Sequence, residues 1–84
     1  MDKKHLAELV GWYGTIAILS AYALANFRII AIDSFEYQLL NLTGAIGIVV
    51  ISVVKKDKQP AVLNAVWAII ALIALITLFF PRVN

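Results

Sequence analysis

Three long apolar stretches, separated by two short polar connections, make up nearly the whole chain. They run over residues 6–27, 37–54 and 61–80. A helix needs about 20 residues to cross the hydrocarbon core of a bilayer, and about 18 can suffice where the bilayer thins. The pattern therefore predicts an all-α fold, an integral membrane bundle of three transmembrane helices in a single domain over residues 1–84.

Each apolar stretch carries one asparagine: Asn26, Asn41 and Asn64. An amide in hydrocarbon is unfavourable unless it finds hydrogen-bond partners, so these residues limit how the helices can face one another. At 100° per residue, small and polar residues form one stripe on each helix. The stripes are Gly11, Gly14, Thr15, Ile18, Tyr22, Ala25 and Asn26; Asn41, Gly44, Ala45, Ile48 and Ser52; and Asn64, Trp67, Ala68, Ala71 and Leu75.

Small residues allow helices to approach closely in lipid, where packing and interhelical hydrogen bonds replace the hydrophobic driving force. We therefore expect the three stripes to face protein and the aliphatic sides to face lipid. The residues expected to make the closest helix packing are Gly11, Gly14, Gly44, Ala45, Ala68 and Ala71.

The two connections contain signals that begin and end helices. Asp33 is expected to cap the second helix, with Glu36 three residues on reaching back as in a capping box. Pro60 suits the first turn of the third helix, because its missing N–H would be unpaired there in any case. Pro81 is expected to close the third span.

The charges predict the orientation in the membrane. Lys3, Lys4 and the three lysines of residues 55–58 lie on one side of a three-span chain, and only Arg28 and Arg82 lie on the other. By the positive-inside rule, we expect the N-terminus in the cytoplasm and the C-terminus outside. The first stretch also resembles a signal peptide with Ala-x-Ala sites, but its length and its glycines and aromatics favour a retained helix.

The composition excludes several functions. Cysteine is absent, which rules out a disulfide framework or an iron–sulfur cluster, and His5 alone cannot form a metal site. There is no catalytic constellation and no phosphate-binding glycine loop, so we expect no enzyme and no cofactor. The lysines flank apolar spans instead of forming a basic face on a soluble fold, so we expect no nucleic-acid partner.

The polar groups within the spans permit two interpretations. One is a substrate pocket or path lined by Tyr22, Asn26, Asn41, Asn64 and Trp67. The other, which we favour, is that each amide bonds a neighbouring helix, typically for about 1 kcal/mol or less. Glu8 lies too close to the boundary for a deep coupling carboxyl, and we expect it to pair with Lys55 or Lys56.

Four sequence blocks carry a family resemblance. They are Gly11-Trp12-x-Gly14, Ser20-Ala21-Tyr22, Tyr37-x-Leu39-Leu40-Asn41-Leu42-x-Gly44-Ala45 and Asn64-x-x-Trp67. Together they resemble a family of small bacterial three-helix membrane proteins, the CBU-type domain, to which no activity is assigned. The resemblance covers nearly the whole chain and implies the same three-helix membrane fold, in the inner membrane of a bacterium.

A second resemblance is more distant. Asp57-x-x-Pro60 followed by Asn64 is similar to the start of the third helix in PQ-loop and SemiSWEET half-transporters. Those chains dimerise in parallel around a path for a sugar or small solute, and Asn64 matches an asparagine of their substrate pocket. The Pro-Gln pair that names the PQ-loop family is absent, and Ser20-Ala21-Tyr22 stands in its place.

Two hypotheses about function follow. The first is a SemiSWEET-like half-transporter that forms a homodimer to pass a small polar solute. The second is an accessory or scaffold subunit of a larger membrane complex, with no path of its own. Both hypotheses expect the chain to lie in membrane lipid and to bind a partner chain, either a second copy or a different polypeptide.

Overall fold

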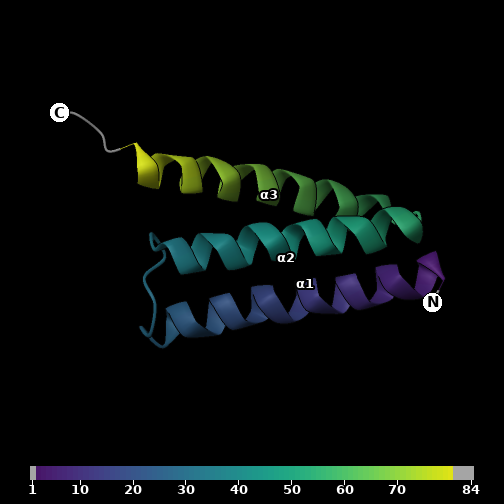
Figure 1. Cartoon of the computed structure of the whole chain (residues 1–84), viewed down its shortest axis with the longest axis horizontal. Coiled ribbons are helices and arrows are strands. Elements are labelled where there is room, and N and C mark those ends of the chain that lie inside the picture. The colour runs from purple at the N-terminus through teal and green to yellow at the C-terminus, as the bar shows by residue number, and fades with distance from the viewer. Residues whose placement is uncertain (1, 81–84) are drawn as a thin grey trace.

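The computed structural model describes residues 2–80, which form the three helices in Figure 1: α1 (Lys3–Asn26), α2 (Phe35–Val54) and α3 (Lys58–Phe79). Each is long and apolar enough to cross a membrane, which confirms the predicted all-α fold with three candidate membrane spans. At 1.5 Å per residue, the helices measure roughly 36, 30 and 33 Å. They begin two or three residues before the apolar stretches, directly after the N-cap residues Asp2, Ser34 and Asp57.

The caps of α1 and α2 explain where these helices begin. The Asp2 side chain accepts a hydrogen bond from the His5 N–H at 2.8 Å, and the Ser34 hydroxyl accepts one from the Tyr37 N–H at 3.2 Å. The prediction that Asp33 caps α2 is therefore wrong. Because Ser34 is the cap, Glu36 stands at the second helical position, one short of the position from which it could reach back.

Both connections begin with the same left-handed turn. Arg28, after α1, has φ of 62° and Lys56, after α2, has φ of 57°. In each turn the next N–H bonds a carbonyl five residues earlier, Ile29 to Leu24 at 2.9 Å and Asp57 to Ser52 at 2.8 Å. The second turn leads directly into α3, where Pro60 lies in the first turn as expected. Pro81 and Arg82 lie outside the described residues.

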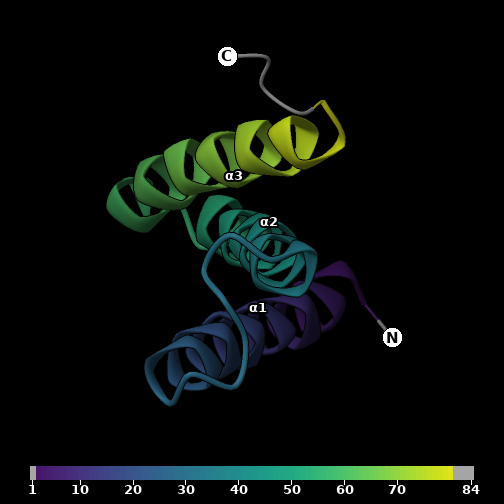
Figure 2. The same ribbon diagram turned by 90° about the vertical axis from the view of Figure 1, so that its left-hand side faces the viewer.

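The three helices form an open row with α2 in the middle (Figures 1 and 2). Helix α2 packs against both neighbours, but within residues 2–80 no Cα of α1 comes within 8 Å of a Cα of α3. The N-terminus and the α2–α3 connection share one end of the row, called here the lysine-rich end; the α1–α2 connection lies at the other. The row encloses no core of large side chains, and its buried apolar residues are mostly alanines.

Helices α1 and α2 touch through their backbones. A Cβ added at Gly14 would collide with the carbonyl oxygen of Gly44, and one added at Gly47 would lie 2.6 Å from the carbonyl oxygen of Val10. Such close approach is the usual role of small residues in membrane helix pairs. Ala7, Gly11, Ala17 and Ala21 continue the buried stripe of α1.

The buried stripe of α1 differs from the predicted one at its far end. The buried positions 7, 11, 14, 17 and 21 are separated by steps of four, three, three and four residues, which average the 3.5-residue repeat of two helices in sustained contact. The predicted stripe instead ended at Tyr22 and Asn26. Both residues are exposed, and the exposed fraction of Tyr22 is 65%. Neither residue is covered by a helix of the same chain, so the expectation that this end of the α1 stripe faces protein stays a prediction.

The contact between α2 and α3 uses larger and more polar residues. Asn41, Ala45 and Ser52 on α2 are buried, as are Asn64, Ala71 and Leu75 on α3, while Ala68 is half-buried. Far from the lysine-rich end, the rings of Phe35 and Phe79 meet edge to face, with centroids 6.1 Å apart. This interface has no glycine, so the helices are spaced by side chains.

Candidate functional site

One side of the helix row carries most of the polar groups within the spans. On α1, Glu8, Thr15 and Tyr22 are seven residues apart, and Asn26 follows one turn later, so all four share a side. On α2 the corresponding row is Tyr37, Asn41, Ile48 and Lys55. Both rows lie outside the α1–α2 glycine contact, and Asn41 is the one member of the α2 row that is buried.

Two hollows show that these rows open on the same side of the molecule. The first lies between α1 and α2 and is lined by Glu8, Gly11, Trp12, Thr15, Ile48, Ile51 and Lys55. The second lies between α2 and α3 and is lined by Tyr37, Gln38, Asn41, Trp67, Ile70 and Ala71. Because the single row of Tyr37, Asn41, Ile48 and Lys55 borders both, the hollows share one side of α2. We call this side the polar face: Glu8, Thr15, Tyr22, Asn26, Tyr37, Asn41, Lys55 and Trp67.

A side-chain hydrogen bond on the polar face joins α2 and α3. The Trp67 indole N–H donates to the Asn41 Oδ1 at 3.0 Å, and the Asn41 amide donates to the Tyr37 carbonyl at 2.8 Å. Asn41 is only 4% exposed, whereas Trp67 is 45% exposed. At 1.5 Å per residue they lie roughly 9 Å and 14 Å into their helices, so Asn41 is about a third of the way along α2 and Trp67 is near the middle of α3. The adjoining hollow has a volume of about 250 Å³.

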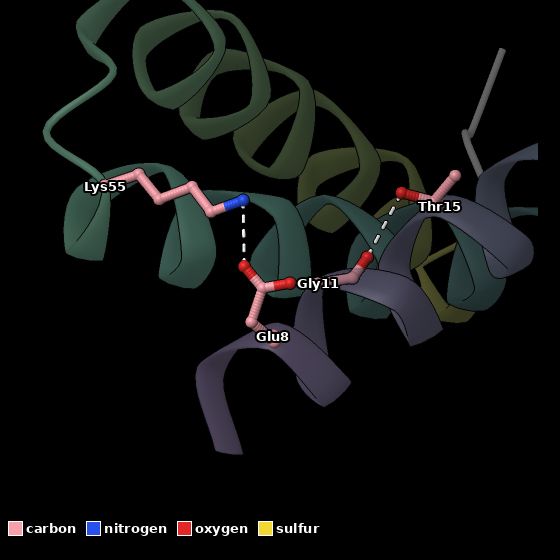
Figure 3. A network of polar contacts seen from close by, with 4 residues as sticks. All are labelled: Glu8, Gly11, Thr15 and Lys55. Carbon is pink, nitrogen blue, oxygen red and sulfur yellow. Dashed lines mark hydrogen bonds and ion pairs between the residues drawn. The ribbon is translucent and has the colours of Figure 1, made fainter. Parts of the chain in front are cut away.

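At the lysine-rich end the polar face carries an ion pair. The Lys55 ammonium lies 2.8 Å from the Glu8 carboxylate, and both side chains are partly exposed. Figure 3 shows the two side chains pointing toward each other. The expectation that Glu8 pairs with Lys55 or Lys56 is confirmed, with Lys55 as the partner. Two turns further along α1, the Thr15 hydroxyl donates to the Gly11 carbonyl at 3.1 Å (Figure 3). Glu8 is thus an anchored boundary residue.

The other two asparagines bond their own helices. The Asn64 amide donates to the Pro60 carbonyl at 3.0 Å, and the Asn26 amide donates to the Tyr22 carbonyl at 2.8 Å. Asn64 is buried at 8% exposure within the α2–α3 contact and lines neither hollow of the polar face. Asn26 is exposed and bonds α1, while the amide of Asn41 bonds α2 and Trp67.

The five residues predicted to line one pocket therefore occupy three places. Asn41 and Trp67 meet beside a hollow, Tyr22 and Asn26 lie exposed on the same side of α1, and Asn64 turns into the α2–α3 contact. Because α1 and α3 do not touch, the first two groups cannot close around a solute within one chain.

Sequence reasoning missed three features. Tyr37 and Gln38 line the hollow beside Asn41, and the spacing from Tyr37 to Asn41 could have placed Tyr37 there. Gly47 was missed in the glycine contact, although it follows Gly44 by three residues. The Tyr13 and Thr43 hydroxyls lie 2.7 Å apart on the side of the row opposite to the polar face, a pairing that depends on the register of two helices.

The comparison with protein families gives one assignment. A family model matches residues 7–82. The chain belongs to this family. The match spans nearly the whole sequence, all three helices included, and is consistent with the resemblance to small bacterial three-helix membrane proteins. No curated protein and no solved structure matches the chain, and the comparisons give no support to the more distant similarity with PQ-loop and SemiSWEET half-transporters.

Proposed function

We propose that this chain is a half-transporter: two copies, related by a two-fold axis along the membrane normal, enclose a path for a small polar solute between their polar faces. The observation that carries the proposal is the polar face itself. In a single chain the Tyr22 side chain, 65% exposed, and the Trp67 side chain, 45% exposed, would face lipid within the spans, and the buried Asn41 borders a hollow beside Trp67. Polar groups at this depth generally face protein or a water-filled cavity.

A second copy is the simplest cover for this face. A two-fold axis along the membrane normal brings the same surface of each chain together and keeps both chains in one orientation. The proposed orientation has the lysine-rich end in the cytoplasm of a bacterium, following the excess of lysines there. The proposal rests on the geometry of the polar face and not on the SemiSWEET resemblance.

The chemistry of the face favours a neutral solute. Charged groups on it are confined to the lysine-rich end, where Glu8 and Lys55 neutralise each other at 2.8 Å. Between there and Asn26, the side chains are the uncharged Thr15, Tyr22, Tyr37, Asn41 and Trp67. Amide and hydroxyl groups beside aromatic rings suit a ligand that both donates and accepts hydrogen bonds.

Cross-linking tests the arrangement of the dimer. Because the chain has no cysteine, a single introduced cysteine reports on one position. Ile48→Cys lies on the polar face, and Val50→Cys lies on the opposite side of α2 at nearly the same depth. In membranes under mild oxidation, we expect Ile48→Cys to give a covalent dimer and Val50→Cys to remain monomeric. The reverse pattern would refute the proposed interface.

Solute flux tests the path. The protein is reconstituted into vesicles, and swelling after an osmotic step is followed with urea, glycerol, xylitol and glucose. We expect at least one solute to enter faster than in protein-free vesicles, Asn41→Leu to abolish this flux, and Val50→Leu to leave it intact. Size-exclusion chromatography checks that Asn41→Leu still assembles. A dimer that passes none of these solutes would rule out transport of small neutral polar solutes. If a different polypeptide were found to cover the polar face, the accessory-subunit hypothesis would be favoured.

A further inference from the structure

The lysine-rich end carries a second hollow outside the polar face. It lies where the α2–α3 connection turns into α3 and is lined by Ser52, Val53, Lys56, Asp57, Lys58 and Ala61. Its volume is about 310 Å³. Val53 and Ala61 supply apolar walls on the membrane side, and the two lysines stand at the rim. An apolar wall below a cationic rim is the arrangement that an amphiphilic anion would fit.

At this end one lysine is held in an ion pair, and the two lysines that line the hollow are not paired within the described residues. Lys55 is bound to Glu8, on the polar face. Lys56 and Lys58 form no ion pair with the residues described by the structure, and both are exposed. Asp57 brings one negative charge to the hollow, so its two lysines leave a net charge of +1. Lys3 and Lys4 add to the positive potential of this end without lining the hollow.

The turn fixes the positions of these lysines. Lys56 occupies the left-handed conformation with φ of 57°, and the Asp57 N–H bonds the Ser52 carbonyl at 2.8 Å. Lys58 is the first residue of α3. The backbone that carries both lysines is therefore held in place by the hydrogen-bonded turn and the start of α3. It lies at the depth where lipid headgroups meet the apolar spans.

We infer that this hollow binds the phosphate of an anionic phospholipid headgroup, with Lys56 and Lys58 holding the phosphate and Val53 and Ala61 contacting the upper acyl chains. Basic residues next to a membrane span attract anionic lipid, and basic pockets between spans bind phosphate headgroups. The inference is independent of the proposed transport, because the site lies outside the polar face and requires one chain only.

Lipid binding by native mass spectrometry of the detergent-purified full chain tests the site. The probes are phosphatidylglycerol, phosphatidylcholine and inorganic phosphate. We expect phosphatidylglycerol to bind roughly tenfold more tightly than phosphatidylcholine, and millimolar inorganic phosphate not to displace it. Equal binding of the two lipids would overturn the proposal, and displacement by inorganic phosphate would show a site for the free anion instead.

Charge variants separate this site from a general attraction to the lysine-rich end. We expect Lys56→Gln/Lys58→Gln to weaken phosphatidylglycerol binding about tenfold. Lys3→Gln/Lys4→Gln, which removes the same charge outside the hollow, should weaken it less than threefold, and Asp57→Asn should strengthen it. Circular dichroism checks that each variant is folded. Equal losses in the two double variants, or weaker binding in Asp57→Asn, would refute the hollow as the binding site.

Discussion

Between α1 and α2 the two backbones touch, whereas between α2 and α3 side chains separate the helices beside a hollow. Gly14, Gly44 and Gly47 leave no room for a single added carbon in the first contact. In the second, Asn41 and Trp67 are joined by a hydrogen bond of 3.0 Å that borders open space. The first pair of helices is thus packed more closely, and the second holds a hydrogen-bonded polar pair between its helices, with Trp67 45% exposed beside the hollow.

The difference has a physical origin in the residues that face α2. Packing in lipid depends on close van der Waals contact, because apolar helices gain little by leaving an apolar solvent. Glycine allows the closest van der Waals contact between two backbones, so it stabilises the helix pair. It has no side chain, so it supplies no group that could bind a solute. Asparagine and tryptophan give less contact but supply a donor and an acceptor that can exchange with a solute.

The largest expected effect comes from adding volume to the glycine contact. Gly14→Ala should lower the free energy of unfolding by about 2 kcal/mol, because the new Cβ would collide with the backbone oxygen of Gly44. The measurement is denaturant unfolding in mixed micelles, followed by circular dichroism. Ala68→Val adds more volume at a half-buried position between α2 and α3 and should cost less than about 1 kcal/mol. Equal losses would mean that the two interfaces are equally tight.

The next effect concerns the hydrogen bond of the α2–α3 contact. Trp67→Phe keeps an aromatic ring but removes the N–H that reaches Asn41, so it should lower the free energy of unfolding by about 0.6 kcal/mol. The same unfolding assay measures the loss. In the Asn41→Leu background the further loss from Trp67→Phe should shrink, because the acceptor is already gone. Full additivity of the two substitutions would argue against the bond.

A smaller effect is expected for the side-chain bond of the α1–α2 contact. Tyr13→Phe removes the hydroxyl that lies 2.7 Å from Thr43, but the Thr43 hydroxyl keeps its bond to the Leu39 carbonyl at 2.9 Å. The loss of unfolding free energy should be below about 0.5 kcal/mol, because the Thr43 hydroxyl still donates its hydrogen bond in the variant. A loss larger than that of Trp67→Phe would show that the α1–α2 contact depends on side-chain bonding as well as on glycine packing.

The smallest effect is expected at the boundary. Glu8→Gln removes the ion pair with Lys55, but exposed pairs of this kind contribute little because water screens them. The thermal midpoint should stay within error of the parent protein, and solute flux should be unchanged. A loss of flux with an unchanged midpoint would mean that Glu8 takes part in transport, which its anchored position argues against.

Much of the fold could be predicted from the sequence because length and hydropathy are local properties. Three stretches of spanning length specify three helices, since a backbone in lipid must bond internally. The pairing of Glu8 with Lys55 was also within reach, because both residues lie near the same end of antiparallel neighbours. The position of Pro60 followed from its missing N–H.

Tertiary structure decided which residues meet. The order α1–α2–α3 across the row, with α1 and α3 apart, separates Tyr22 and Asn26 from Asn41 and Trp67, and periodicity within one helix carries no information on that order. The 3.5-residue repeat of the α1 stripe arises from contact with α2, so a straight-helix projection misplaced its far end. The sequence alone determined three membrane helices with polar groups to satisfy. Packing against α2 decided which of those groups are buried and which form one open face.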